Sequence, residues 1–175
     1  KEIIETLLDT FRPDEPVDLV VSIDNMWGEK MDGYKTTQER LDAYDLVDPR
    51  IKIINFPSRE DYVKYLKTGH VFVSCARSEG WNLPLIEAMA CGTPSIYSNW
   101  SGQLEFAQGR GLPVEITDIR PANVEHKDFT GNYCEPDWGD LSRVMLDAVK
   151  FQDRDKILAL SEAKEIHKFF NWEHV

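Results

Sequence analysis

Short apolar segments alternate with helical segments along most of this chain, and this alternation constrains the fold more than any other feature. The apolar segments predict strands at residues 17–23, 51–55, 70–75, 94–97 and 112–116. They lack strict apolar–polar alternation, so both faces of each strand are expected to be buried. Strands that alternate with helices at this spacing predict an α/β fold with a doubly wound, Rossmann-like parallel sheet.

The segments between and after these strands predict helices. They lie near residues 3–11, 36–46, 58–68, 84–91, 103–108, 138–151 and 155–170. Residues 24–34 are expected to form a polar loop, and residues 117–135, which mix Gly, Pro and polar residues without a clear period, a long loop. No linker or internal repeat interrupts the pattern, so residues 1–175 are expected to form a single domain.

Composition excludes several classes of protein. No apolar run approaches the roughly 20 residues of a membrane helix, so a soluble domain is expected. The net charge is −11 and no block of Lys or Arg is present, which argues against a nucleic-acid partner. The three cysteines are widely spaced, and Cys75 and Cys91 are predicted to be buried, reduced thiols, which favours a cytoplasmic location.

The segment that follows the strand at residues 70–75 carries the candidate site. Ligands of an open parallel sheet bind beyond the carboxyl ends of its strands. Pro84 suits the first turn of a helix, so the preceding amides should point out of the helix start, where a diphosphate could bind. Glu79 and Glu87 bracket this position. Without further context, Glu79 could equally be a loop carboxylate near a helix start, and Glu87 a charge on a helix surface.

Residues 77–94 read R-S-E-G-W-N-L-P-L-I-E-A-M-A-C-G-T-P. This sequence strongly resembles the E-x₇-E segment of retaining, family-four-type glycosyltransferases with the two-domain GT-B fold. Other stretches are similar to that family too: S-N-W-S-G-Q-L-E at residues 98–105, G-N-Y-C-E-P-D at 131–137 and F-F-N-W-E-H-V at 169–175. The resemblance covers almost the whole chain and implies the carboxyl-terminal, donor-binding half of a GT-B enzyme.

The resemblance also implies roles for individual residues. Glu79 would contact the transferred sugar, and Glu87 would accept hydrogen bonds from the two ribose hydroxyls. The diphosphate or sugar would meet the backbone amides of Gly80, Trp81, Asn82 and Leu83, of which Asn82 stands where the family often has Gly. Phe56 and Pro57 lie where the family holds the nucleotide base.

The implied reaction is transfer of a sugar from a nucleoside diphosphate sugar to an acceptor hydroxyl, with retention of configuration. No cofactor and no obligatory metal are expected; the D-x-D at residues 153–155 lies between two helices rather than at a strand end. The family's phosphate-binding Arg and Lys are expected upstream of this chain, because Lys1 does not match their register. The acceptor (a glycan, lipid or protein) would bind the amino-terminal half, expected to be absent here, through which a peripheral membrane contact would also occur.

Three other kinds of protein would show parts of this pattern. A nicotinamide-dependent dehydrogenase would share the sheet, but no G-x-G-x-x-G follows any predicted strand. A non-catalytic nucleotide-binding or scaffold domain could keep both glutamates without turnover. A synthase or phosphorylase of the glycogen or sucrose type has the same fold and the same carboxylate pair.

Overall fold

The structure is a computed structural model that describes residues 1–22, 33–122 and 130–170. These form two compact units, residues 1–62 and 63–175. The expectation that residues 1–175 form a single domain stays a prediction. Most of the loop expected at residues 24–34, and residues 171–175 of the closing segment, lie outside the described residues.

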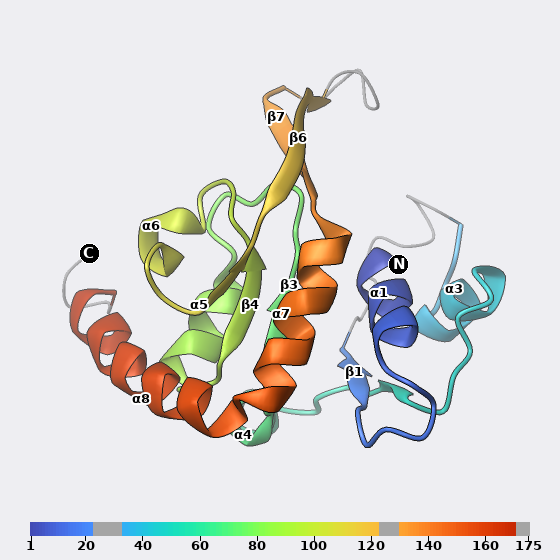
Figure 1. Cartoon of the computed structure of the whole chain (residues 1–175), viewed down its shortest axis with the longest axis horizontal. Helices are drawn as coiled ribbons and strands as arrows, with labels where there is room; N and C mark the ends of the chain where they lie inside the picture. Colours follow the sequence, from blue (N-terminus) through green and yellow to red (C-terminus); the bar gives the residue numbers. More distant parts are fainter. Residues whose placement is uncertain (23–32, 123–129, 171–175) are drawn as a thin grey trace. The chain divides into compact units, whose positions relative to one another are not determined.

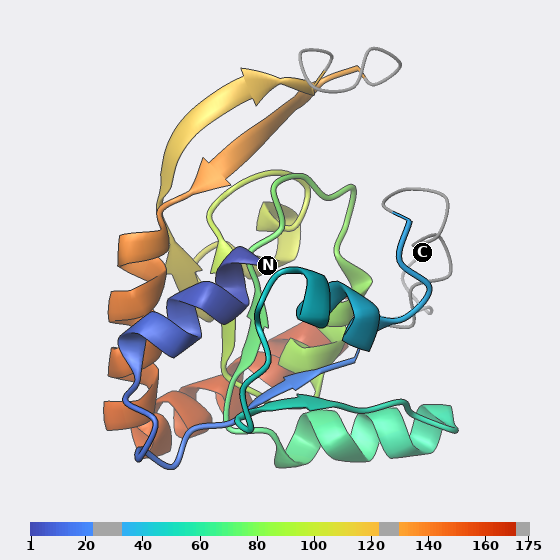
Figure 2. The ribbon, with the colours of Figure 1, turned by 90° about the vertical axis from the view of Figure 1, so that its right-hand side faces the viewer.

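Among its described residues, the first unit contains a parallel pair of strands and two complete helices. Its elements are α1 (Glu2–Thr10), β1 (Leu19–Val21), α3 (Thr37–Ala43), β2 (Ile51–Ile53) and the first residues of α4 (Arg59–Thr68). Strand β1 runs beside β2, with Leu19 opposite Ile51 (Figure 2). The core of this unit is formed by Ile4, Leu41 and Leu46.

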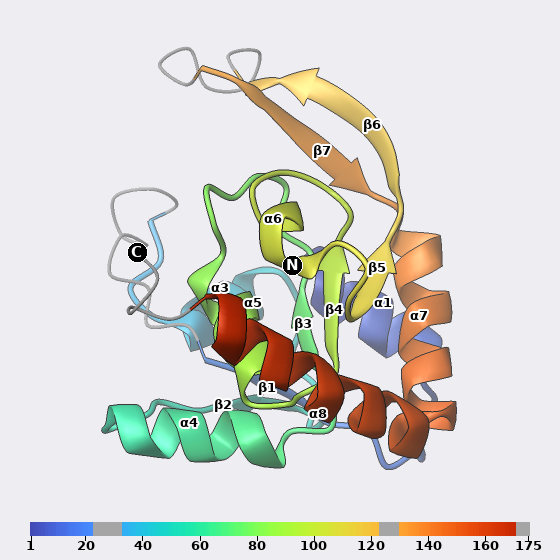
Figure 3. The same ribbon diagram turned by 90° about the vertical axis from the view of Figure 1, so that its left-hand side faces the viewer.

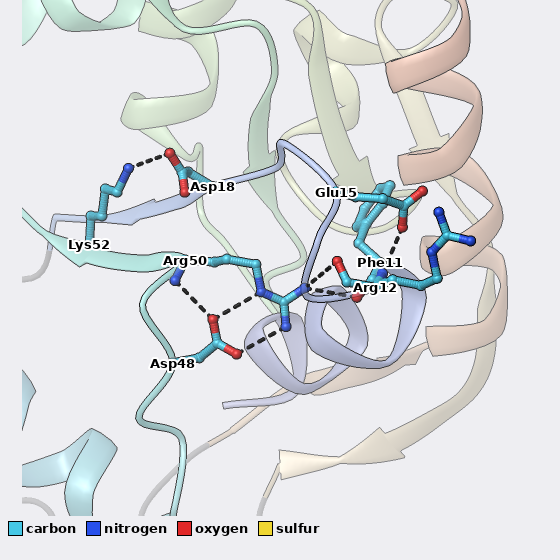
Figure 4. A network of polar contacts seen from close by, with 7 residues as sticks. All are labelled: Phe11, Arg12, Glu15, Asp18, Asp48, Arg50 and Lys52. Atoms are coloured by element: carbon cyan, nitrogen blue, oxygen red, sulfur yellow. Dashed lines mark hydrogen bonds and ion pairs between the residues drawn. The ribbon is translucent and has the colours of Figure 1, made fainter.

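A buried guanidinium stabilises the first unit (Figure 4). Arg50 is 7% exposed and donates to both carboxylate oxygens of Asp48, at 2.9 and 3.0 Å. It also donates to the carbonyl oxygens of Phe11, at 2.8 Å, and Arg12, at 3.2 Å. These hydrogen bonds join the end of α1 to the start of β2, and the bond from Arg50 lowers the pKa of Asp48.

The second unit is built on three parallel strands in the order β3 (Phe72–Ser74), β4 (Ser95–Ser98) and β5 (Leu112–Val114). Helix α5 (Leu83–Ala90) contacts β3, β4 and α8 (Gln152–Phe169), whereas α7 (Trp138–Lys150) contacts β5 (Figures 1 and 3). The short helix α6 (Leu104–Ala107) follows β4. All four residues of β4 are buried, including Ser95 and Ser98. The main core cluster contains Leu85, Met89, Tyr97, Phe106, Ala107 and Ile166.

The prediction of a long loop over residues 117–135 is wrong for residues 117–121 and 132–135, whereas residues 123–129 lie outside the described residues. Strands β6 (Ile116–Pro121) and β7 (Asn132–Pro136) pair antiparallel there, with Ile119 opposite Cys134. The pair extends beyond the three-stranded sheet (Figures 1 and 3). No residue of β6 is buried, so its sequence carries no apolar alternation by which a strand could be recognised.

The cysteines differ from expectation in one position. None of the three forms a disulfide; Cys75 and Cys134 are buried, but Cys91, at the carboxyl end of α5, is only half-buried. Burial, together with the neighbouring Cys134, raises the pKa of Cys75 to about 12. Among the described residues, no helix is long and apolar enough to cross a membrane.

Candidate functional site

The loop between β3 and α5 carries Glu79, and a second turn holds it in place. The backbone N–H of Glu79 donates to Ser101 Oγ at 3.2 Å, and Ser101 Oγ donates to the Glu79 carbonyl at 2.7 Å. The Gly102 N–H donates to the same carbonyl at 3.1 Å. Burial of the half-buried Glu79 side chain raises the pKa of its carboxyl group. The loop therefore presents a carboxyl group on a backbone that is fixed from a distant part of the sequence.

The two glycines at this contact have opposite surroundings. A Cβ atom added to Gly102 would lie 2.1 Å from the carbonyl oxygen of Gly80, so only glycine fits there. A Cβ atom added to Gly80 would meet nothing within 4 Å. Space beside Gly80 is what a ligand would need to approach the backbone closely.

Asn82 explains how the loop turns into α5. Its backbone is left-handed, with φ 62° and ψ 67°, a conformation that Gly and Asn adopt more readily than other residues. Its side chain is buried and accepts a hydrogen bond from Leu85 N–H at 3.3 Å, which caps the helix. Asn can therefore stand where the family often has Gly. Only the backbone of Asn82 remains for a ligand.

The start of α5 has unsatisfied donors. Among the residues that the structure describes, no atom accepts a hydrogen bond from the backbone N–H of Gly80, Trp81 or Leu83. Pro84 lies in the first turn, as predicted. The ring of Trp81 packs against Phe106 and Phe170, with centroids 5.4 and 6.0 Å away.

Glu87 lies on the outward side of α5. Leu83, one turn earlier on the same side, is 61% exposed, whereas Leu85, Ala88 and Met89 face the core. Side chains of a helix lean toward its amino-terminal end, so the Glu87 carboxylate leans toward the start of α5. A separate open hollow lies along the turn at residues 101–102 and helix α6, and it is lined by Ser101, Gly102, Leu104, Glu105 and Gln108.

Phe56 and Pro57 belong to the first unit, in the segment between β2 and α4. The Phe56 ring meets the Tyr62 ring edge-on, with centroids 5.4 Å apart, and Pro57 is exposed. The structure thus brings Glu79, Gly80, Trp81, Asn82, Leu83 and Glu87 together on one loop and helix, while the base-binding role of Phe56 and Pro57 stays a prediction. Within residues 1–22, 33–122 and 130–170, no group of three or more His, Cys, Asp or Glu is placed to hold a metal ion.

Residues 26–110, which include the Glu79–Glu87 segment, match the family described as "Glycosyl transferases group 1". The chain is also similar to "Putative glycosyltransferase 48" of Sulfolobus islandicus filamentous virus (isolate Iceland/Hveragerdi), with 36% identity over 61 residues. That match covers 35% of this chain and 19% of the viral protein.

Two solved structures resemble the chain along its length. Anabaena Alr3699/HepE in complex with UDP and glucose gives a TM-score of 0.71 at 15% identity, over 97% of this chain and 40% of that one. Sucrose-phosphate synthase (tll1590) from Thermosynechococcus elongatus gives 0.64 at 22% identity, over 98% of this chain and 39% of that one. The chain thus spans about two fifths of the length of these two structural neighbours. The likeness confirms the Rossmann-like α/β class of one half of a GT-B fold.

Proposed function

We propose that this chain binds the nucleoside diphosphate sugar donor of a retaining glycosyltransferase at the start of α5. The observation that carries the proposal is the loop at residues 76–82. Together with the first residue of α5, it carries the amides of Gly80, Trp81 and Leu83, for which the described residues offer no acceptor, in the stretch of sequence between Glu79 and Glu87. The match of residues 26–110 to the family described as "Glycosyl transferases group 1" supports it.

Each group has a chemical task in this proposal. The amides and the helix dipole hold the diphosphate, and the open space beside Gly80 lets it approach. Glu87 accepts hydrogen bonds from both ribose hydroxyls, because one carboxylate has acceptor sites for two donors. Glu79 orients the sugar through its hydroxyls.

The proposed transfer keeps the anomeric configuration. The acceptor oxygen forms a bond to the anomeric carbon on the face from which the diphosphate leaves. The departing phosphate oxygen takes the acceptor's proton. Amide dipoles stabilise the charge that develops on the diphosphate, which is the role that preorganised donors have in other transferases.

The experiment is calorimetric titration with UDP and UDP-glucose, the ligands named for the Anabaena neighbour. Glu87→Ala should make the binding free energies of both UDP and UDP-glucose less favourable by about 1–3 kcal/mol, the cost of losing hydrogen bonds to a charged group. Glu79→Gln should weaken the binding of UDP-glucose only, since UDP lacks the transferred sugar that Glu79 is proposed to contact. Equal losses in both variants would show that the two carboxylates are assigned to the wrong parts of the donor. If the wild-type chain bound none of UDP, GDP, ADP, dTDP or their sugars, the donor site would be rejected.

A sucrose-synthase-type enzyme is the second candidate, favoured by the likeness to sucrose-phosphate synthase. Release of UDP from UDP-glucose that depends on a sugar phosphate acceptor would favour it. In the full-length protein, a scaffold domain would instead bind nucleotide without any sugar-transfer activity that Glu79→Gln could reduce.

A further inference from the structure

Gln103 is a buried polar side chain that serves another element. It is 1% exposed and stands at the amino-terminal cap of α6, yet its side chain does not cap that helix. Its Nε2 donates to the carbonyl oxygen of Ser98 and, at 3.1 Å, to Ser98 Oγ. Its Oε1 accepts from Asn82 Nδ2 at 2.6 Å. A buried amide is costly unless its polar atoms are bonded, and these bonds satisfy Gln103.

The partner of Gln103 is the residue that turns the loop into α5. Asn82 Nδ2 uses its second hydrogen on Ser74 Oγ, at 3.0 Å, at the end of β3. Ser98 Oγ in turn donates to the carbonyl of Ala76, where the same loop begins. Gln103 and Ser98 therefore connect both ends of the loop to the end of β4.

The residues directly before Gln103 hold the middle of the loop. Ser101 and Gly102 bond the backbone of Glu79, and Gly102 lies against the peptide of Gly80. Three consecutive residues, 101–103, thus fix Glu79, Gly80 and Asn82.

We propose that Gln103 is a positioning residue, which sets the conformation of the Glu79–Asn82 loop through Asn82 and does not touch the donor. This inference rests on the proposed donor site for its functional consequence, but its structural part stands alone. Without Gln103, Asn82 loses the hydrogen bond that connects it to the end of β4. The loop can then adopt other backbone conformations, in which the amides of Gly80 to Leu83 point in different directions.

The test compares Gln103→Met with Thr93→Val in the full chain. Methionine keeps the length of the side chain and removes its hydrogen bonds. Thr93 is a matched control, because it is 2% exposed and its buried Oγ1 donates to the Leu66 carbonyl at 2.6 Å, with no bond to the loop. Two measurements are made on each: amide NMR signals and relaxation dispersion of residues 79–83 without ligand, and the Kd for UDP-glucose.

Gln103→Met should split or broaden the signals of residues 80–83 and raise the Kd for UDP-glucose about tenfold, which corresponds to the free energy of about one hydrogen bond. Thr93→Val should lower the urea midpoint while leaving those signals and the Kd unchanged. Combined with Asn82→Gly, Gln103→Met should add little further loss, because both changes act through one contact.

Sharp, unshifted signals for residues 80–83 in Gln103→Met would overturn the proposal. The same broadening in Thr93→Val would also overturn it, since the effect would then be one of general stability. If the loop signals broadened as expected but the wild-type chain bound no UDP-glucose, the positioning role would stand and the proposed donor site would fail.

Discussion

Glu79 combines a loop position with partial burial, and this makes its ionised form costly. Burial raises the pKa of its carboxyl group above the ordinary value. The folded chain then binds the proton more tightly than the unfolded chain does. Stability from this group is therefore fully present below the ordinary pKa of about 4.3 and is lost as the pH rises through the raised pKa.

We accordingly expect Glu79→Gln to unfold at a higher urea concentration than the wild type at pH 7. The difference should disappear below about pH 3, where the wild-type carboxyl group is protonated in both the folded and the unfolded state. Urea titrations of both proteins at several pH values provide the measurement. A lower midpoint for the variant at pH 7 would mean that the structure stabilises the ionised carboxylate.

The contrast between Gly80 and Gly102 gives a second prediction. Gly102→Ala should destabilise the chain by about 1–3 kcal/mol, because its Cβ would overlap the backbone of Gly80. Gly80→Ala should fold with little change, since the space beside it is open, but should weaken UDP. Denaturant midpoints and calorimetry on both variants measure these effects. Unchanged UDP affinity in Gly80→Ala would remove Gly80 from the proposed site.

Part of the candidate site could be predicted from single residues and their neighbours. Glu79, Glu87 and the helix start at Pro84 were found because they lie within one continuous segment. The bond between Asn82 and Gln103 joins residues far apart in the sequence, and nothing local in either indicates the other. The S-N-W-S-G-Q-L-E stretch was noticed as a resemblance, but its support of the Glu79 loop depends on how the chain folds back.

At the scale of elements, the parallel strands were predictable because they contain apolar residues without strict alternation, as in Leu-Val-Val of β1. Strands β6 and β7 were not, since polar contacts stabilise them. Glu135 on β7 pairs with Arg120 of β6 at 3.4 Å and with Arg77 of the site loop at 3.0 Å, and accepts from Trp138 Nε1 at 2.8 Å. Ion pairs of this kind leave no period in the sequence.

The position of β7 can be tested through its cysteine. The Cys134 N–H donates to the Arg77 carbonyl at 2.9 Å, and burial raises the pKa of both Cys134 and Cys75. The thiolate is the form that reacts with alkylating reagents. Cys134 and Cys75 should therefore be alkylated at least about ten times more slowly than half-buried Cys91 in the native chain at pH 8. Peptide mapping after timed labelling measures this, with labelling in urea as the control. Equally fast labelling of Cys134 would show that β7 does not stay against the loop.

At the scale of the whole molecule, the chain spans about two fifths of the length of its structural neighbours. We expect these 175 residues to bind a nucleotide but to transfer almost no sugar, because the acceptor is proposed to bind outside them. The measurement is UDP release from UDP-glucose over many turnovers, beside calorimetry on the same sample. Sustained turnover by this chain would show that acceptor recognition lies within it.

The close approach of Gly102 to Gly80 has a consequence for engineering. Any attempt to redirect donor preference will begin by randomising residues 80–82, which are adjacent in the sequence and easy to reach with one primer. Residues 101–103, however, hold the backbone of this loop. Most members of such a library would therefore keep contacts that suit only the original loop sequence. A library that varies residues 80–82 together with residues 101 and 103, and keeps Gly102 constant, changes the loop and the residues that support it at the same time.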